Sequence, residues 1–293
     1  AASTYYENEV FDVIHAHDWM GITAGLLAKS ILKIPLVAHI HSIEADRNGA
    51  GGDRGIREKE QKGLHTADAI ICVSNETKQN LINTYQIDAD KVFVIPNATR
   101  WKVRQPKFLN KNTPKITFMG RLTHQKSPGK ILDLARELEN GDHLFQYEII
   151  GDGYLKDQLM HTAAQINLSS KVDFAGFQEP DKLKKRLKES SLVVVPSVSE
   201  PFGLVAIEAT AMGIPVMISE GAGVNEYIPF RTFRHWDLHG MKKLALQLIS
   251  DKASTLQYVQ DCQAALKKLK WSTTSGTISK LYKMLVEDQN SGN

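Results

Sequence analysis

Short apolar runs rich in β-branched residues alternate with helical patterns along almost the whole chain. Runs with the length and composition of buried strands cover residues 10–15, 35–41, 69–73, 92–95, 115–119, 145–150, 172–175, 192–196 and 215–218. Helical patterns between them cover residues 22–32, 55–65, 75–85, 129–139, 154–166, 180–188 and 203–211. Such strands are buried on both faces, and the helices connect them as crossovers, so the pattern predicts α/β architecture with parallel sheets.

A polar, basic segment divides this pattern in two. Residues 98–114 contain two prolines and match neither period, so they are the candidate linker. The sequence therefore predicts a first Rossmann-like domain over residues 1–110 and a second over residues 111–270. A last helix over residues 271–293 is expected to pack back on the first domain.

Composition excludes several classes of protein. A net charge of +3 in 293 residues is too small to indicate nucleic-acid or membrane binding. No run of 18 apolar residues is present, so no transmembrane segment is expected. The two cysteines, Cys72 and Cys262, have no CxxC partner, which fits a reducing compartment and a cytoplasmic location.

The segment SEPFGLVAIE carries the strongest chemical signal. Glu200 lies in the loop after a strand, a helix begins near Gly203, and Glu208 lies inside that helix. Free backbone N–H groups at Phe202, Gly203 and Leu204, with the positive end of the helix dipole, suit a phosphate. A carboxylate offers two acceptor oxygens to vicinal hydroxyls. A loop glutamate and an amphipathic-helix glutamate meeting by chance is the open alternative.

Two basic residues follow another strand end. The sequence GRLTHQK places Gly120 at the end of the strand KITFM, with Arg121 and Lys126 after it. Arginine can grip phosphate with two hydrogen bonds and lysine supplies a point charge. Both residues could also be plain surface charges.

A pair of histidines follows the first strand. His15 and His17 lie in the sequence HAHDW, and both would project on one side if the strand continued through them. We expect the strand to end at His15, so that only one imidazole faces a site. A histidine at a strand end is more often structural than catalytic.

Taken together, these motifs resemble the family 4 retaining glycosyltransferases. EPFGLVAIE is similar to their E-x7-E element, GRLTHQK to their diphosphate element, and HAHDW to their glycogen and starch synthase branch. The likeness continues through HIHS, CVS, VIPN, IIGDG, FAGF, VPS and GAGVNEYI…WDLHGM. The resemblance implies the GT-B fold, in which two Rossmann-like domains face each other across a cleft.

The resemblance also implies roles for single residues. Glu200 would bind hydroxyls of the donor hexose, and Glu208 would hold the nucleotide ribose. Arg121 and Lys126 would neutralise the departing diphosphate, and His17 would contact the donor sugar near its anomeric carbon.

The remaining implied contacts are to the donor. The N–H groups of Phe202, Gly203 and Leu204 would help to hold the diphosphate, Gly120 belongs to the diphosphate element, and Phe177 would lie against the base. The implied reaction keeps the α-linkage by front-face attack through an oxocarbenium-like state, so no nucleophile is nominated.

Substrates and partners follow from the same likeness. It implies a hexosyltransferase of the EC 2.4 class that uses UDP-glucose or ADP-glucose as a substrate and a carbohydrate such as a glucan as the acceptor. No cofactor and no metal are expected. Asp88 and Asp90 form an Asp-x-Asp, the metal-holding pattern of the other large glycosyltransferase fold, but they lie between a helix and a strand, which favours a turn.

The likeness begins late relative to the family. The strands and the glycine-rich loop that precede HAHDW in family members are not found before it here, so we expect an incomplete N-terminal domain. An exposed edge strand tends to pair with another chain, which suggests a homo-oligomer or a partner chain. The alternative function is a nucleotide-sugar-binding fragment or subunit that is catalytically impaired without such a partner.

Overall fold

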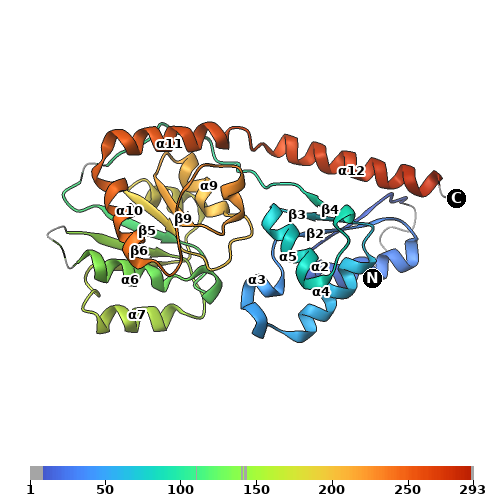
Figure 1. Cartoon of the computed structure of the whole chain (residues 1–293), viewed down its shortest axis with the longest axis horizontal. Helices are drawn as coiled ribbons and strands as arrows, with labels where there is room; N and C mark the ends of the chain where they lie inside the picture. The colour runs from blue at the N-terminus through green and yellow to red at the C-terminus, as the bar shows by residue number, and fades with distance from the viewer. Residues whose placement is uncertain (1–8, 110, 140, 142–143, 292–293) are drawn as a thin grey trace. The chain divides into compact units, whose positions relative to one another are not determined.

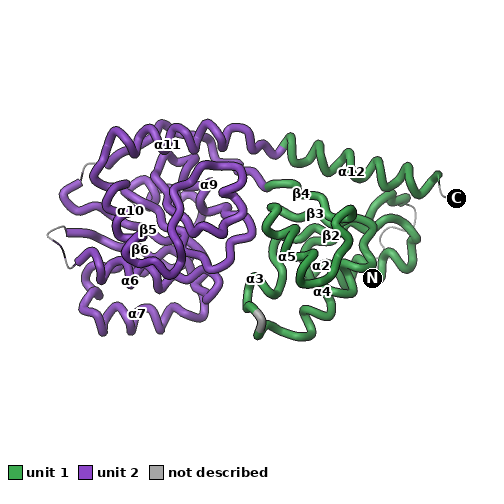
Figure 2. The backbone as a smooth tube through the Cα atoms, in the orientation of Figure 1, with its two compact units in different colours: residues 1–96, 272–293 green, residues 97–271 purple. Residues whose placement is uncertain are grey.

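The protein is described by a computed structural model that covers residues 9–109, 111–139, 141 and 144–291. The chain forms two compact units, shown in different colours in Figure 2. Unit 2 is the continuous segment Asn97–Trp271, whereas unit 1 combines the chain up to Pro96 with the segment from Ser272 onward.

Unit 1 is built on a four-stranded parallel sheet with the order β1-β2-β3-β4. Its strands are β1 (Ile14–His17), β2 (Leu36–Ile40), β3 (Ala69–Cys72) and β4 (Val92–Val94). Its helices are α2 (Asp18–Leu32), α3 (Glu44–Asn48), α4 (Arg54–Thr66), α5 (Asn75–Tyr85) and α12 (Trp271–Ser291). Every residue of β2 and β3 is buried, as expected for strands covered on both faces.

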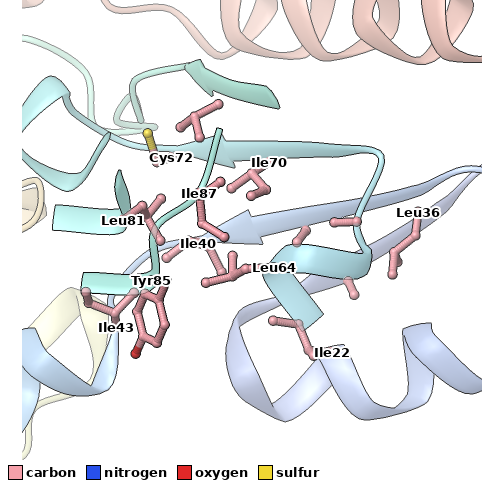
Figure 3. Close-up of a cluster of buried hydrophobic side chains, with 14 residues drawn as sticks. Ile22, Leu36, Ile40, Ile43, Leu64, Ile70, Cys72, Leu81, Tyr85 and Ile87 are labelled. Carbon is pink, nitrogen blue, oxygen red and sulfur yellow. The ribbon is translucent and has the colours of Figure 1, made fainter. Parts of the chain in front are cut away.

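Different helices cover the two faces of this sheet. On one face, Ile22 of α2, Leu64 of α4 and Leu81 of α5 pack with alternate residues of β2 and β3 (Figure 3). On the other face, Leu281 of α12 packs with residues of β2 and β3 that point the opposite way, Val37 among them. The end of the chain therefore completes the core of unit 1.

We predict that Leu281→Ala destabilises unit 1. Leu281 is 5% exposed, and truncating a buried leucine costs about 2–5 kcal/mol through lost burial and the cavity left behind. Urea unfolding should show this loss. Met284→Ala is the control, because Met284 lies on the same helix and is 41% exposed, so its cost should stay below about 1 kcal/mol. Equal losses in the two variants would contradict this packing role for α12.

Unit 2 is built on a six-stranded parallel sheet with the order β10-β9-β8-β5-β6-β7. Its strands are β5 (Lys115–Met119), β6 (Gln146–Ile150), β7 (Val172–Gly176), β8 (Leu192–Val195), β9 (Val216–Ser219) and β10 (Arg231–Phe233). Its helices are α6 (Gly129–Leu138), α7 (Lys156–Gln165), α8 (Pro180–Leu187), α9 (Leu204–Ala211), α10 (Leu238–Ser250) and α11 (Lys252–Leu266). Figure 1 shows α6 and α7 on one side of this sheet and α9 and α11 on the other.

The strand order of unit 2 creates a switch point between β5 and β8. From β5 the chain proceeds to β6 and β7, and after α8 it returns to β8 and continues outward to β9 and β10. The loops that leave β5 and β8 therefore diverge at the carboxyl edge of the sheet. Open parallel sheets bind their ligands in the crevice at this point.

Both units contain the parallel sheets that the alternating pattern predicts, but several elements differ. β1 continues through His17, whereas we expected it to end at His15. β10 was missed because a three-residue edge strand has too few residues to show a period. The helical pattern of residues 252–289 is divided into two helices, which are α11 and, where the last helix was predicted over residues 271–293, α12.

The polar segment after residue 97 packs against unit 2. The N–H groups of Arg104 and Lys107 donate to the carbonyls of Ala211 and Gly213, at 2.7 and 2.8 Å. Gly213 has φ +79, and a Cβ there would lie 2.3 Å from the carbonyl oxygen of Gln105. The start of unit 2 is thus held at the end of α9 by backbone contacts that require a glycine.

Candidate functional site

Polar side chains cluster at the switch point of unit 2. Arg121 and Lys126 follow β5, Glu200 follows β8, and these two strands are hydrogen-bonded neighbours with Phe118 paired to Val194. The carboxyl ends of parallel strands share one edge of the sheet, so the loops that carry these residues meet there. The candidate site is this edge together with the start of α9.

Glu200 is held in place by two donors. Lys126 Nζ lies 2.8 Å from Glu200 Oε2, and Ser197 Oγ donates to the same oxygen at 2.9 Å. Glu200 is only 8% exposed, and its carbonyl accepts from the N–H of Gly223 at 2.9 Å. Within the described residues, the other carboxylate oxygen, Oε1, makes no hydrogen bond. That oxygen is available to a ligand hydroxyl.

The start of α9 lies beside Glu200 and is open. Gly203 precedes the first helical residue with φ +119, and a Cβ there would come 2.9 Å from Val224 and 3.6 Å from Glu200 Cγ. Phe202 is buried and Leu204 is exposed. In the described part of the chain, no side chain caps this helix start, and the N–H groups of Gly203 and Leu204 donate to no acceptor. The arrangement favours an anion.

Two glycine-containing loops approach closely at the same edge. Gly151 has φ +137, and a Cβ there would lie 1.8 Å from the carbonyl oxygen of Gly120. Gly153 has φ +156, and a Cβ there would lie 2.5 Å from the carbonyl oxygen of Leu122. The loop after β6 thus supports the loop that carries Arg121. Within the described ranges, the exposed Arg121 guanidinium makes one side-chain hydrogen bond, to Gln125 Oε1 at 3.5 Å.

Glu208 lies in α9 with its carboxyl half-buried. Burial raises the pKa of this carboxyl from 4.5 to about 7. Among the described residues, no cation or hydrogen-bond donor pairs with it. A partly protonated carboxyl without a partner in the protein can serve as both donor and acceptor to a ligand hydroxyl.

We predict that Glu208 makes stability fall as pH rises. Between pH 4.5 and about 7 the folded state retains a proton on Glu208 that the unfolded state has lost. The contribution of this proton to the free energy of unfolding is therefore present in full below pH 4.5 and is lost as the pH rises through 7. Glu208→Gln cannot titrate. The free energy of unfolding of the variant, measured with urea, should therefore rise relative to that of wild type by up to about 3 kcal/mol between pH 4.5 and pH 8.

The matched control for this prediction is Glu220→Gln, because Glu220 is exposed on a loop of the same unit. Its difference from wild type should be constant across the same pH range. A Glu208→Gln difference that is equally constant would contradict the raised pKa.

Phe177 is not part of this cluster. It follows β7, the edge strand, which β6 and β5 separate from β8 in the sheet order, and it is 72% exposed. The resemblance implies that this exposed ring lies against the base, and that contact remains a prediction.

The histidines lie in unit 1 and form a stack. His15 and His17 are on β1, His39 is on β2 and His41 follows it, and their neighbouring ring centroids are 4.3–5.3 Å apart. The expectation that the strand ends at His15 was wrong, because β1 continues to His17, and alternate residues of a strand share a face. Their rings are parallel within 9°.

The environment lowers the pKa of three of these imidazoles, those of His15, His39 and His41. Burial, with repulsion from the neighbouring histidines, lowers the pKa of His15 to about 4 and that of His39 to about 2. Burial also lowers the pKa of His41, and the carboxylate of Asp18 opposes that shift. Sequence reasoning did not predict the stack because it depends on the register that pairs His17 with His39.

Asp88 and Asp90 form a turn. The side chain of Asp88 accepts a hydrogen bond from the N–H of Asp90 at 3.1 Å and caps a 3₁₀ turn, Ala89–Lys91. Among the described residues, the one cluster of potential metal ligands consists of the histidines of unit 1, so this Asp-x-Asp is no part of it.

The structure thus brings together Glu200, Lys126 and Gly203, with Arg121 on the same segment after β5 as Lys126. Sequence reasoning missed Ser197, whose only signal was its place in the strand-end sequence VPS. Within the described ranges, no helix has both the length and the apolar character needed to cross a bilayer.

Two family models match consecutive parts of the chain. The model described as Glycosyltransferase Family 4 matches residues 3–100, and the model described as Glycosyl transferases group 1 matches residues 99–229. An uncharacterized glycosyltransferase of Methanocaldococcus jannaschii is 34% identical over 77% of this chain, and a D-inositol 3-phosphate glycosyltransferase of Nocardia farcinica is 30% identical over 73%. The matched regions span 62% and 52% of those two proteins.

Solved structures show the same fold at low identity. Sucrose-phosphate synthase from Thermosynechococcus elongatus superposes with a TM-score of 0.85 at 21% identity, covering 98% of this chain and 77% of that one. HepE from Anabaena in complex with UDP-glucose superposes with a TM-score of 0.80 at 19% identity, covering 93% and 79%. With two parallel-sheet units and two consecutive family matches, the chain belongs to the glycosyltransferases of the GT-B fold class.

Proposed function

We propose that the chain is a retaining hexosyltransferase that moves glucose from a nucleoside-diphosphate sugar to a carbohydrate acceptor such as a glucan. The observation that carries the proposal is the junction of three features at the switch point of unit 2. These are a fixed, buried carboxylate at Glu200, an ammonium beside it at Lys126, and an uncapped helix start at Gly203.

The donor site follows from hydrogen-bonding capacity. Glu200 Oε2 is occupied by Lys126 and Ser197, so Oε1 accepts from a hydroxyl of the hexose. The Lys126 ammonium has three N–H donors and uses one on Glu200, which leaves two for phosphate oxygens. Arg121 and the N–H groups of Gly203 and Leu204 add further donors to the diphosphate.

The same groups explain how transfer would be accelerated. Departure of a nucleoside diphosphate concentrates negative charge on the leaving oxygen. Cations and N–H groups that are already fixed in place stabilise that charge without reorganising. Because Glu200 fixes Lys126, the pair supplies both the hydrogen bond to the sugar and the electrostatic stabilisation of the leaving group.

The remaining roles come from the resemblance of the motifs. The proposal assigns the nucleotide ribose to Glu208, the base to Phe177 and the contact near the anomeric carbon to His17. Glucose and a glucan acceptor rest on the HAHDW sequence. HepE, a structural relative with the same fold, was crystallised with UDP-glucose, which supports a nucleotide-sugar donor.

The test is a donor panel with two readouts. UDP-, ADP- and GDP-sugars are screened by thermal shift, since a ligand that binds the folded state raises its melting temperature. Donors that bind are then assayed for hydrolysis and for transfer to oligosaccharides, with the product anomer assigned by NMR. An α-linked product from an α-linked donor is expected, and an inverted product would refute the retaining reaction.

A second function is distinguished by the same panel. β1 is an edge strand of the unit 1 sheet, and the chain spans 62% or less of the two relatives named above. If nucleotide-sugars raise the melting temperature but none is turned over, the chain is a donor-binding subunit. If no nucleotide-sugar binds, both functions are wrong.

A further inference from the structure

The histidine stack of unit 1 has the composition and spacing of a transition-metal site. One ring nitrogen from each of His15, His17 and His39 lies within 4.8 Å of the other two. Three imidazoles that leave a fourth position open are a known zinc ligand set. Imidazole nitrogen also suits nickel and copper, whereas magnesium and calcium require oxygen ligands.

The distances between ring nitrogens fit coordination. In a tetrahedral site with Zn–N bonds of about 2.0–2.1 Å, two ligand nitrogens lie about 3.3 Å apart. His39 Nδ1 and His15 Nε2 are 3.2 Å apart, and His17 Nδ1 and His41 Nε2 are 3.1 Å apart. Each of these two pairs is therefore at nearly the spacing of two nitrogens that bind one zinc ion, and the nitrogens of His15, His17 and His39 all lie within 4.8 Å of one another.

His39 supplies an independent observation. It is 5% exposed, and its buried Nε2 has no hydrogen-bond partner among the residues that the structure describes. A buried polar nitrogen without a partner is costly. It is a different atom from the Nδ1 that faces His15, so one ion can bind His39 through only one of these two nitrogens.

His15 has the outer contact that metal-bound histidines use. Its Nδ1 is hydrogen-bonded to the hydroxyl of Tyr282 on α12. When Nδ1–H donates to that oxygen, Nε2 carries the free lone pair and faces His39. Because Tyr282 holds His15 and burial holds His39, the exposed His17 ring is the one free to turn out of the stack toward a metal.

We propose that His15, His17 and His39 form a binding site for one zinc-class ion, with His41 or a water as the fourth ligand. Under the proposed function, a metal on His17 removes that imidazole from the donor sugar. Zinc would therefore inhibit transfer, and a chelator would reverse the inhibition. That consequence rests on the proposed function, whereas metal binding itself does not.

Direct binding tests the proposal without any donor. The whole chain is dialysed against Zn²⁺, and the bound metal is counted. One ion per chain is expected in wild type, and Mg²⁺ should not compete for it. His17→Gln and His15→Gln should weaken binding by more than about 100-fold, because loss of an outer-shell partner alone weakens a metal site by 10–100-fold.

Two controls make the result decisive. His161→Gln removes an exposed histidine of α7, outside the stack, and should bind as wild type does. Thermal melting without metal checks that each variant folds, and His17 is exposed, so its variant tests the site even if His15→Gln does not fold. Wild type that takes up no zinc, or equal uptake by the His17 and His161 variants, would overturn the proposal.

Discussion

Glu200→Gln should lower donor turnover by about 100–1000-fold, measured as kcat/KM with the best donor of the panel. Under the proposed function, the substitution replaces a charged acceptor of a hexose hydroxyl by a neutral amide, which weakens that hydrogen bond. It also leaves Lys126, whose side chain is 19% exposed, without its anion. The ammonium is then free to shift away from the position where it stabilises the leaving diphosphate.

Two further variants separate this effect from damage to the fold. Glu220→Gln removes an exposed carboxylate of the same unit, 3.7 Å from Arg234, and should stay within about twofold of wild type. The double variant Glu200→Gln with Lys126→Gln should lose less than the product of the single losses, because the two residues act as one unit. Turnover by Glu200→Gln close to the wild-type value would refute the site assignment.

Gly151→Ala should destabilise unit 2 by more than about 3 kcal/mol. A Cβ would lie 1.8 Å from the carbonyl oxygen of Gly120, which is backbone and cannot turn aside, and φ is +137, a conformation that side chains rarely adopt. The displaced strand is the one that leads to Arg121. Urea unfolding should show the loss, and thermal shift should show weaker binding of nucleoside diphosphate.

Gly176→Ala is the matched control for this prediction. Gly176 also ends a strand of the same sheet, with φ +66, but a Cβ there would meet no atom within 4 Å. Its cost should be only the backbone strain, about 1–2 kcal/mol. If the two variants lose the same stability, the close approach of the two loops is not what requires glycine at residue 151.

The parts of the structure that sequence could predict are those that depend on local pattern. The strand over residues 115–119 and the helix over residues 75–85 have the predicted bounds, because a buried apolar run and a capped amphipathic helix are local features. Glu200, Arg121 and Lys126 could be nominated because each follows a strand end. The direct contact between Lys126 and Glu200 could not be predicted, since it depends on β5 and β8 being neighbours.

The histidine stack could not be predicted from local sequence patterns. The sequence alone left open how far the first strand continues. Because β1 extends two residues beyond His15, to His17, four imidazoles stack on one face. The lowered pKa values of His15, His39 and His41 depend on burial and on neighbouring histidines, so they follow from tertiary packing. A site composed of alternate residues on neighbouring strands cannot be predicted until the register is known.

The packing of α12 on unit 1 has a consequence for synthesis. Unit 2 is continuous in sequence, whereas the sheet of unit 1 remains uncovered on one face until Leu281 has left the ribosome. The segment translated first therefore finishes folding last. Until then, the apolar face around Val37 and Ile71 is exposed, and such transiently exposed apolar surface is prone to aggregation.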